Sequence, residues 1–522
     1  MSKSSKRLRQ IYDNIYGYIN FPREDFDFIL KDPFFLRLHN LKQMGLAYYV
    51  YPDALHSRFA HSIGVYTNVC KIIDSQNQIT SLKTDQENDK YKIQLSALLH
   101  DIGHVPLSHT IERALNKFDN YEKEIKGARE HSGTKQLLQV EEEELQKEES
   151  SVVKLMPKES LKVALHERLG EAVLENCNIG HHLRTHDIAP LEISAGFKGD
   201  IAFAYQQEHE STSQSFFNSQ IRNFLHSQLD ADRIDYLLRD ASFSGVNTGS
   251  IDIDKLLNSI FYDKSNYGVD VSAIRALDQF FISRYVAYCQ IVGNKKVMAF
   301  EYMASDFYYR LLLLRKKEKY HLRIRLYSYQ DLVSDILPNK PEEFLTFTDD
   351  YFFSLIREVV ANKEDVRRQD KLVVEYAEML TKGQPLSAVT YIEGFDDNLK
   401  NKYGEDICFI EFLHNESMKE ESDILNKVAH EAGIDKSEII IPDPMKITLY
   451  TDERDPVQVF ENGEVILENV SHSPASLLWM LKDKKYCIYR IYTLDKNNRG
   501  NLRNALLAFA KEYNYKNFGD LK

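Results

Sequence analysis

Apolar side chains recur at helical spacing over most of the chain. Between residue 1 and about residue 330 they stand three and four positions apart, as at Val65, Val69, Ile72 and Ile73, which predicts a bundle of helices. The helical pattern continues from about 331 to 400, where we expect a helical lobe. No internal repeat is evident.

Beyond residue 400 the apolar period changes to that of strands. We expect strands at 407–412, 439–441, 447–450, 457–467 and 486–492, and helices at 476–481 and 501–513. Asn462-Gly463 lies within the fourth of these strand segments and is a strong signal for a two-residue hairpin turn. The pattern therefore predicts a mainly α protein with three parts: 1–330, 331–400 and a small α+β domain at 401–522.

An acidic segment interrupts the first part. Residues from about 119 to 160 contain Glu141 to Glu144 and Glu148-Glu149 and offer few apolar side chains to a core. We interpret this segment as an exposed or partly disordered insertion.

Composition narrows the class of protein. A chain of 522 residues with 43% hydrophobic content is long enough for two or three cores, and its net charge of −13 argues against a broad nucleic-acid surface. Apolar stretches of membrane-spanning length and a signal peptide are both missing from the sequence, so we expect a cytoplasmic protein that binds no membrane. The five cysteines never form a CxxC pair, which indicates neither a disulfide framework nor a zinc knuckle. A basic run at 315–325 is either a solvated helix end or an anion or effector-nucleotide site.

Histidine and aspartate stand side by side at His100-Asp101, inside the apolar run 95–104. Burying such groups costs several kcal/mol unless they are paired or hold a cation. With His61 and Asp232 they make a set of imidazoles and carboxylates suited to Mn, Fe, Ni, Co or Zn, while the carboxylates alone would accept Mg. This predicts a divalent metal site with open positions, and such sites hydrolyse phosphate esters.

The local pattern places these residues near helix ends. Pro106 should separate His100, Asp101 and His104, at the end of one helix where His100 and His104 share a face, from a segment that starts at His109. Ser57 is a plausible cap for a helix that follows it.

The motifs resemble, in order, those of the HD superfamily of metal-dependent phosphohydrolases, and specifically its deoxynucleoside triphosphate triphosphohydrolase branch. The matching segments are 35–52, 58–65, 100–109, 166–167 and 230–240, so the resemblance spans about 20 to 300. It implies an HD-domain helical bundle. It also implies that the metal ligands are His61, His100, Asp101 and Asp232.

The same resemblance assigns roles to further residues. A catalytic shell orients the attacking water and protonates the leaving oxygen, and it comprises His104, His109, Glu112 and His166, with His109 as the general acid. Phosphates would be held by Arg58, Arg233, Arg284 and, more weakly, Lys295. The sugar side would be formed by Gln43, Tyr236, Asp240 and Tyr288, and Asp230 belongs to the same substrate-binding block. His131 competes with His166 for one catalytic position; Glu167 and the amphipathic helix that follows favour His166.

The expected reaction is hydrolysis of a dNTP to deoxynucleoside and tripolyphosphate. A homo-oligomer (dimer, tetramer or hexamer) and a nucleotide effector are implied as well. Two alternatives stay open: a phosphodiesterase or nuclease acting on nucleic acid or a signalling nucleotide, and a catalytically silent nucleotide-sensing module.

Overall fold

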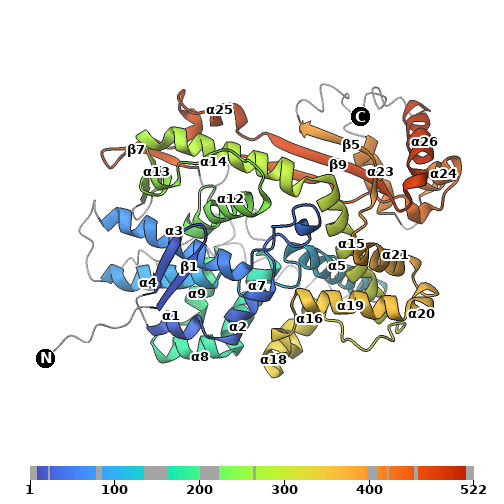
Figure 1. The fold of residues 1–522 in the computed structure, drawn as a ribbon, viewed down its shortest axis with the longest axis horizontal. Coiled ribbons are helices and arrows are strands. Elements are labelled where there is room, and N and C mark those ends of the chain that lie inside the picture. The colour runs from blue at the N-terminus through green and yellow to red at the C-terminus, as the bar shows by residue number, and fades with distance from the viewer. Residues whose placement is uncertain are drawn as a thin grey trace.

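The computed structural model describes residues 9–21, 24–77, 85–133, 163–199, 223–262, 266–396, 409–419, 422–451 and 456–512. Helices dominate this part of the chain, which confirms the mainly α prediction (Figure 1). No described helix is long and apolar enough to cross a membrane.

Long helices build the first half of the molecule. They are α3 (Arg58–Asn77), α4 (Asp85–Leu99), α5 (His109–Gly133), α7 (Leu165–Asn176), α8 (Asn178–Thr185), α9 (Pro190–Lys198), α12 (Ala231–Ser244), α14 (Ile274–Ala287) and α15 (Lys295–Lys316). Shorter helices join them: α1 (Glu24–Ile29), α2 (Pro33–Leu36) and α13 (Ile253–Leu257). The apolar positions Val65, Val69, Ile72 and Ile73 of α3 are buried, as their helical spacing predicts.

A second group of helices follows α15. It consists of α16 (Tyr329–Asp331), α17 (Leu337–Asn339), α18 (Pro341–Leu345), α19 (Asp349–Ala361), α20 (Lys363–Arg367) and α21 (Lys371–Thr381). The large core of the first half continues through these helices.

Strands of the described residues form three small sheets. The strands are β1 (Arg9–Asp13), β2 (Gly17–Phe21), β3 (Ile260–Tyr262), β4 (Tyr267–Asp270), β5 (Ser387–Phe395), β6 (Met445–Thr448), β7 (Gln458–Glu461), β8 (Glu464–Leu467) and β9 (Lys485–Thr493). Their orders are β1-β2, β3-β4-β7-β8 and β5-β9-β6. The helices of this region are α23 (Phe409–Ser417), α24 (Asp423–Ala432), α25 (Leu478–Leu481) and α26 (Arg499–Glu512). The C-terminal elements lie along one long side of the molecule, from β7 and α25 to α24 and α26 (Figure 1).

Several local predictions differ from the structure. The predicted strand at 407–412 is wrong where it is described, because α23 begins at Phe409 and buries Phe409, Ile410 and Leu413 at helical spacing. The lobe expected to be helical through residue 400 contains β5, which pairs with β9. The predicted bundle also contains the hairpins β1-β2 and β3-β4. Of the acidic segment, 119–133 belongs to α5 and 134–160 lies outside the described residues.

Candidate metal and catalytic site

Three segments far apart in the sequence bring the predicted metal ligands together. His61 lies in α3, His100 and Asp101 follow the end of α4, and Asp232 lies in the first turn of α12. The Nε2 atom of His61 is 2.9 Å from Asp232 Oδ1 and 3.3 Å from Nε2 of His100. It is 3.8 Å from Asp101 Oδ2. All three partners therefore lie within 3.8 Å of Nε2 of His61, and the ligand atoms of His61, His100 and Asp101 lie within 4.8 Å of one another.

The orientation of the two imidazoles fits a cation. Nδ1 of His61 bonds to Asp235 Oδ2 at 2.7 Å, and Nδ1 of His100 bonds to the carbonyl of Ala97 at 2.8 Å. Each Nδ1 therefore donates to a protein acceptor and each Nε2 faces the cluster, where a bound cation would take the place of any proton on it. Ligand atoms about 2.1 Å from a common ion lie about 3 Å apart, close to the separations found here. The residues fit a divalent metal ion.

The charges agree with this geometry. Burial opposes ionisation, but Arg58 and His100 hold the pKa of Asp101 well below its usual range. Burial also disfavours a charged His61, yet Asp232 and Asp235 outweigh it and raise the pKa of His61 to about 10. The two carboxylates thus favour a positive charge between them. Burial lowers the pKa of His100, which favours the neutral imidazole that binds metals.

A buried series of ion pairs holds the imidazole of His61 through its Nδ1 atom. Asp235 accepts hydrogen bonds from Nε and NH2 of Arg239, both at 2.9 Å, and Arg239 NH1 donates to Asp13 Oδ2 at 2.9 Å. Asp13 ends β1, so this series of ion pairs runs from the N-terminal hairpin to the metal ligands. Gly64 makes room for it, because a Cβ there would lie 1.9 Å from Asp235 Oδ1.

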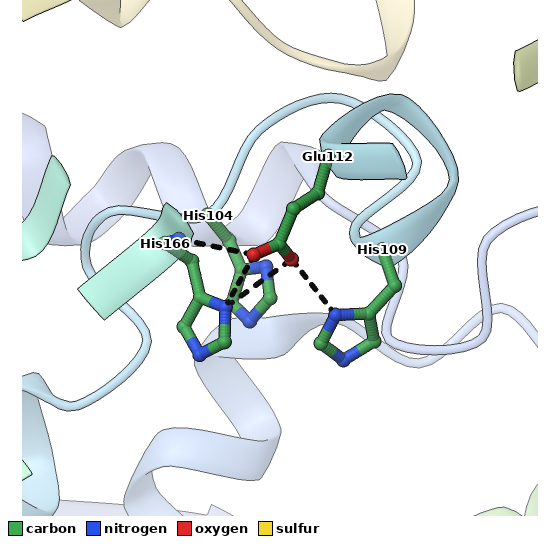
Figure 2. A group of neighbouring side chains, drawn as sticks. All are labelled: His104, His109, Glu112 and His166. Carbon is green, nitrogen blue, oxygen red and sulfur yellow. Dashed lines mark hydrogen bonds and ion pairs between the residues drawn. The ribbon is translucent and has the colours of Figure 1, made fainter. Parts of the chain in front are cut away.

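The predicted catalytic residues form a second cluster (Figure 2). It lies beside the first, because Nε2 of His104 is 3.1 Å from Asp101 Oδ1. It comprises His104, His109, Glu112 and His166. Glu112 Oε2 lies 2.9 Å from Nδ1 of His109 and 3.3 Å from Nδ1 of His166. The rings of His104 and His166 stack with centroids 4.0 Å apart.

The members of this cluster differ in charge and exposure. Burial and the charge of Arg58 lower the pKa of His104 far below its usual value, so it stays neutral. Glu112 outweighs the effect of burial and raises the pKa of His166. The His109 side chain is 64% exposed, whereas that of Glu112 is 8% exposed. His109 is thus the member best placed to meet a ligand.

Turns rather than a helix carry His100 to Ser108. Because α4 ends at Leu99, His100 and His104 lie in these turns and do not share a helical face as predicted; α5 begins at His109, as expected. Leu107 and Ser108 have φ of 51° and 55°, a left-handed conformation that costs about 1–2 kcal/mol per residue. Gly103 permits the contact with α7, since a Cβ there would lie 2.1 Å from the carbonyl of His166.

Two cavities meet at the predicted substrate residues. The first, about 210 Å³, contains His100, Asp101, Asp232 and the catalytic histidines, and Arg233 also lines it. The second, about 260 Å³, has mainly apolar walls and includes Asp240 and Tyr288. The residues that line both are Gln43, Arg58, His109 and Tyr236. The buried Oε1 of Gln43 has no partner within the described part of the chain.

Three predicted substrate residues do not line either cavity: Asp230, Arg284 and Lys295. Asp230 is fully buried, accepts the backbone N–H of Arg233 at 2.8 Å to cap α12, and forms an ion pair with the Arg233 side chain. Burial raises the pKa of Asp230 to about 7 although Arg233 opposes the rise. Arg284 donates to the carbonyl of Leu449 at 3.1 Å.

In the basic run at 315–325, the residues Arg315, Lys316 and Arg325 form ion pairs with acidic residues. The side chain of His131 lies outside the description.

Sequence reasoning missed several residues of the site. His56 bonds to Asp240 Oδ1 through Nε2 at 2.9 Å, and Ser108 accepts from Arg58 Nε at 2.7 Å. His226 lines the first cavity, and burial lowers its pKa to about 4. Position in the sequence was the available signal for two of these residues. His56 lies two positions before Arg58, and Asp235 follows Ile234 in the charged block of α12.

Comparison with known proteins matches the part of the chain that contains the predicted metal ligands. The family model described as "HD domain" matches residues 58–239. Residues 58–239 are therefore similar to an HD domain. All four predicted metal ligands and Asp235 lie inside the matched range, whereas Gln43, Asp240 and Tyr288 lie outside it.

Relatives extend the similarity beyond the HD domain. The chain is 23% identical over 450 residues to the uncharacterized protein YwfO of Bacillus subtilis, covering 83% of this chain and 80% of YwfO. It is 24% identical over 378 residues to the Dictyostelium discoideum protein named deoxynucleoside triphosphate triphosphohydrolase SAMHD1 homolog, covering 71% of this chain and 59% of that protein. The solved structure of a phosphohydrolase from Bacteroides thetaiotaomicron shares the fold, with a TM-score of 0.60 at 19% identity over 93% of this chain and 100% of that one.

Proposed function

We propose that the protein is a metal-dependent phosphohydrolase that cleaves dNTPs to deoxynucleoside and tripolyphosphate. The observation that carries the proposal is the meeting of the two cavities at Gln43, Arg58, His109 and Tyr236. One cavity offers cation ligands and arginines for phosphates, and the other offers apolar walls for a sugar and base. The name of the Dictyostelium relative supports the same substrate class.

The chain's own residues divide the proposed reaction among them. His61, His100, Asp101 and Asp232 would hold the divalent ion, which when bound lowers the pKa of water and offsets phosphate charge. Arg58 and Arg233 present guanidinium groups to the phosphates in the first cavity. Water attacks the α-phosphorus and the bond to the 5′-oxygen breaks.

The leaving 5′-oxygen needs a proton, and His109 is the proposed donor. Its Nδ1 is held by Glu112, so its Nε2 is the nitrogen that faces a ligand. Glu112 also bonds His166, which keeps both rings in fixed orientations. His104 is neutral and its ring stacks on that of His166, so its proposed role is to pack against His166 and not to donate a proton.

A substrate panel tests the proposal. Each dNTP, NTP and 2′,3′-dideoxynucleotide is incubated alone and in pairs with Mn or Mg, beside single-stranded DNA, and tripolyphosphate is measured. We expect tripolyphosphate from at least one dNTP, and faster turnover in mixtures if a second nucleotide acts as effector. Hydrolysis of DNA or of a ribonucleotide alone would favour the phosphodiesterase alternative, and no hydrolysis of any kind would favour the silent module. The oligomeric state stays a prediction.

A further inference from the structure

Asp349 is a buried carboxylate outside the HD domain that bonds two segments of the site. It begins α19, and its side chain is 3% exposed. Its partners are Leu107 and Lys42, which lie 242 and 307 residues away in the chain. Neither partner is a predicted ligand of metal or substrate, so the contact is an indirect one.

The first bond fixes the strained turn before α5. Asp349 Oδ1 accepts the backbone N–H of Leu107 at 2.8 Å. Leu107 and Ser108 are the two left-handed residues that lead directly into His109. A left-handed pair without glycine persists only when its surroundings hold it. The bond from Asp349 therefore helps to set where His109 begins its helix.

The second bond fixes the segment that presents Gln43. Asp349 Oδ2 accepts the backbone N–H of Lys42 at 3.0 Å and lies 3.4 Å from its Nζ. The Ser108 hydroxyl joins this segment to the turn, because it donates to the Lys42 carbonyl at 3.0 Å and accepts from Arg58 Nε at 2.7 Å. The network thus reaches Arg58, which contacts Asp101 Oδ2 at 2.6 Å.

Arg37 closes the same network at the other end of the turn. Its NH2 donates to the carbonyl of His104 at 2.6 Å and to that of Phe347 at 2.7 Å. Burial lowers the pKa of Arg37 to about 9, which leaves it charged at neutral pH. Residues 347–349 are therefore joined to His104 through Arg37 and to Leu107 directly, at the two ends of the segment 104–107.

We propose that Asp349 is a positioning residue for the substrate side of the site. It sets Gln43, Arg58 and His109 relative to one another and itself bonds none of the predicted metal ligands. The substrate side of the site therefore depends on a segment outside the matched range 58–239. The effect on turnover rests on the proposed function, but the effect on the two backbone segments does not.

The test compares Asp349→Asn with Asp350→Asn in the full-length protein. An amide offers one acceptor and one donor where two backbone N–H groups need two acceptors. Asp350 is exposed and lies in the same first turn of α19, so its variant controls for the loss of a charge at this helix start. Hydrogen–deuterium exchange is measured on peptides covering 40–46 and 103–109, together with bound metal and with kcat and KM for the best dNTP.

We expect Asp349→Asn to raise amide exchange at Lys42 and Leu107 at least tenfold with unchanged metal content. We expect kcat/KM to fall at least tenfold, and Asp350→Asn to match the wild type in every measurement. Unchanged exchange and turnover would overturn the proposal. So would faster exchange throughout the protein, which would make Asp349 a general stabilising residue, and so would loss of metal. If the wild type hydrolyses no dNTP, the proposed function fails while the exchange result still decides the role of Asp349.

Discussion

His109 is the exposed member of a cluster whose other side chains are buried or half-buried. If it protonates the leaving oxygen, His109→Ala should lower kcat by roughly two or more orders of magnitude, the usual contribution of a positioned acid. The metal content should stay unchanged because His109 lies in the second cluster. Kinetics with metal analysis checks both, and His181→Ala, at an exposed histidine of α8, is the control. A variant that loses metal along with activity would make His109 a ligand.

Asp240 is the side chain we expect to recognise the sugar. It is held by His56 at the wall of the second cavity, where Gln43 offers an unpartnered oxygen within the described residues. Buried polar groups disfavour a substrate that cannot pair with them, so dNTPs should exceed 2′,3′-dideoxynucleotides in kcat/KM. Asp240→Ala should narrow that ratio, whereas Asp254→Ala, at an exposed aspartate, should preserve it. An unchanged ratio in Asp240→Ala would remove Asp240 from sugar recognition.

Single residues also show where sequence reasoning stopped. The HD motif residues were predictable because their types and order are unusual in apolar surroundings. The contacts of His56, Asp235 and Asp349 were not predictable, since their partners lie 184, 174 and 242 residues away. Only the folded chain reveals such pairs. The substrate roles of Asp230, Arg284 and Lys295 stay predictions, and none of the three lines a described cavity.

The junction of α5 and α7 depends on one ionised carboxylate. Glu112 Oε1 accepts the backbone N–H of Leu165 at 2.8 Å and that of His166 at 3.3 Å, at the positive end of α7. Burial opposes ionisation, but hydrogen bonds from His109 and His166 hold the pKa of Glu112 far below its usual value of about 4.3. Its contribution to stability is therefore fully present above about pH 4.3 and is lost as the pH falls below it.

Glu112→Gln should lower the free energy of unfolding at pH 7, and its difference from the wild type should shrink as the pH falls below about 4.3 toward about pH 2. Urea unfolding at both pH values measures this difference, with Glu342→Gln, at an exposed glutamate of α18, as the control. A difference that does not change with pH would mean that the charge of Glu112 contributes nothing to the junction.

At the level of elements, local signals were reliable and distant pairing was not. Asn462 and Gly463 adopt φ of 53° and 85°, which confirms the predicted hairpin of β7 and β8. Strand β5 was missed because its partner β9 lies about a hundred residues further along the chain. The segment at 409–412 satisfied a strand pattern over four residues, and only its continuation to Leu413 shows the helical spacing.

For the whole molecule, the predicted boundaries at 330 and 400 stay hypotheses, and one sheet joins the middle of the chain to its C-terminal part. Strand β4 pairs in parallel with β7, so residues near 268 and 458 share a sheet. Gly268 is required there, because a Cβ would lie 2.0 Å from the carbonyl oxygen of Gln458.

Gly268→Ala should therefore lower the free energy of unfolding by about 1–3 kcal/mol, the usual cost of overpacking. Gly500→Ala is the matched control, since a Cβ at this position of α26 meets nothing within 4 Å. Denaturant unfolding of the two variants measures the difference. Equal stability would mean that the sheet yields at this point without cost.

The convergence of α3, α12 and the end of α4 on one set of ligands has a thermodynamic consequence. An ion bound there would cross-link three segments between residues 61 and 232, and unfolding would have to release it. Any ion that binds only the folded chain stabilises it, by about 2.7 kcal/mol at a hundred times its dissociation constant. The melting temperature would then rise with the free metal concentration. The size of this rise would rank Mn, Fe, Co, Ni, Zn and Mg by affinity before any substrate is known.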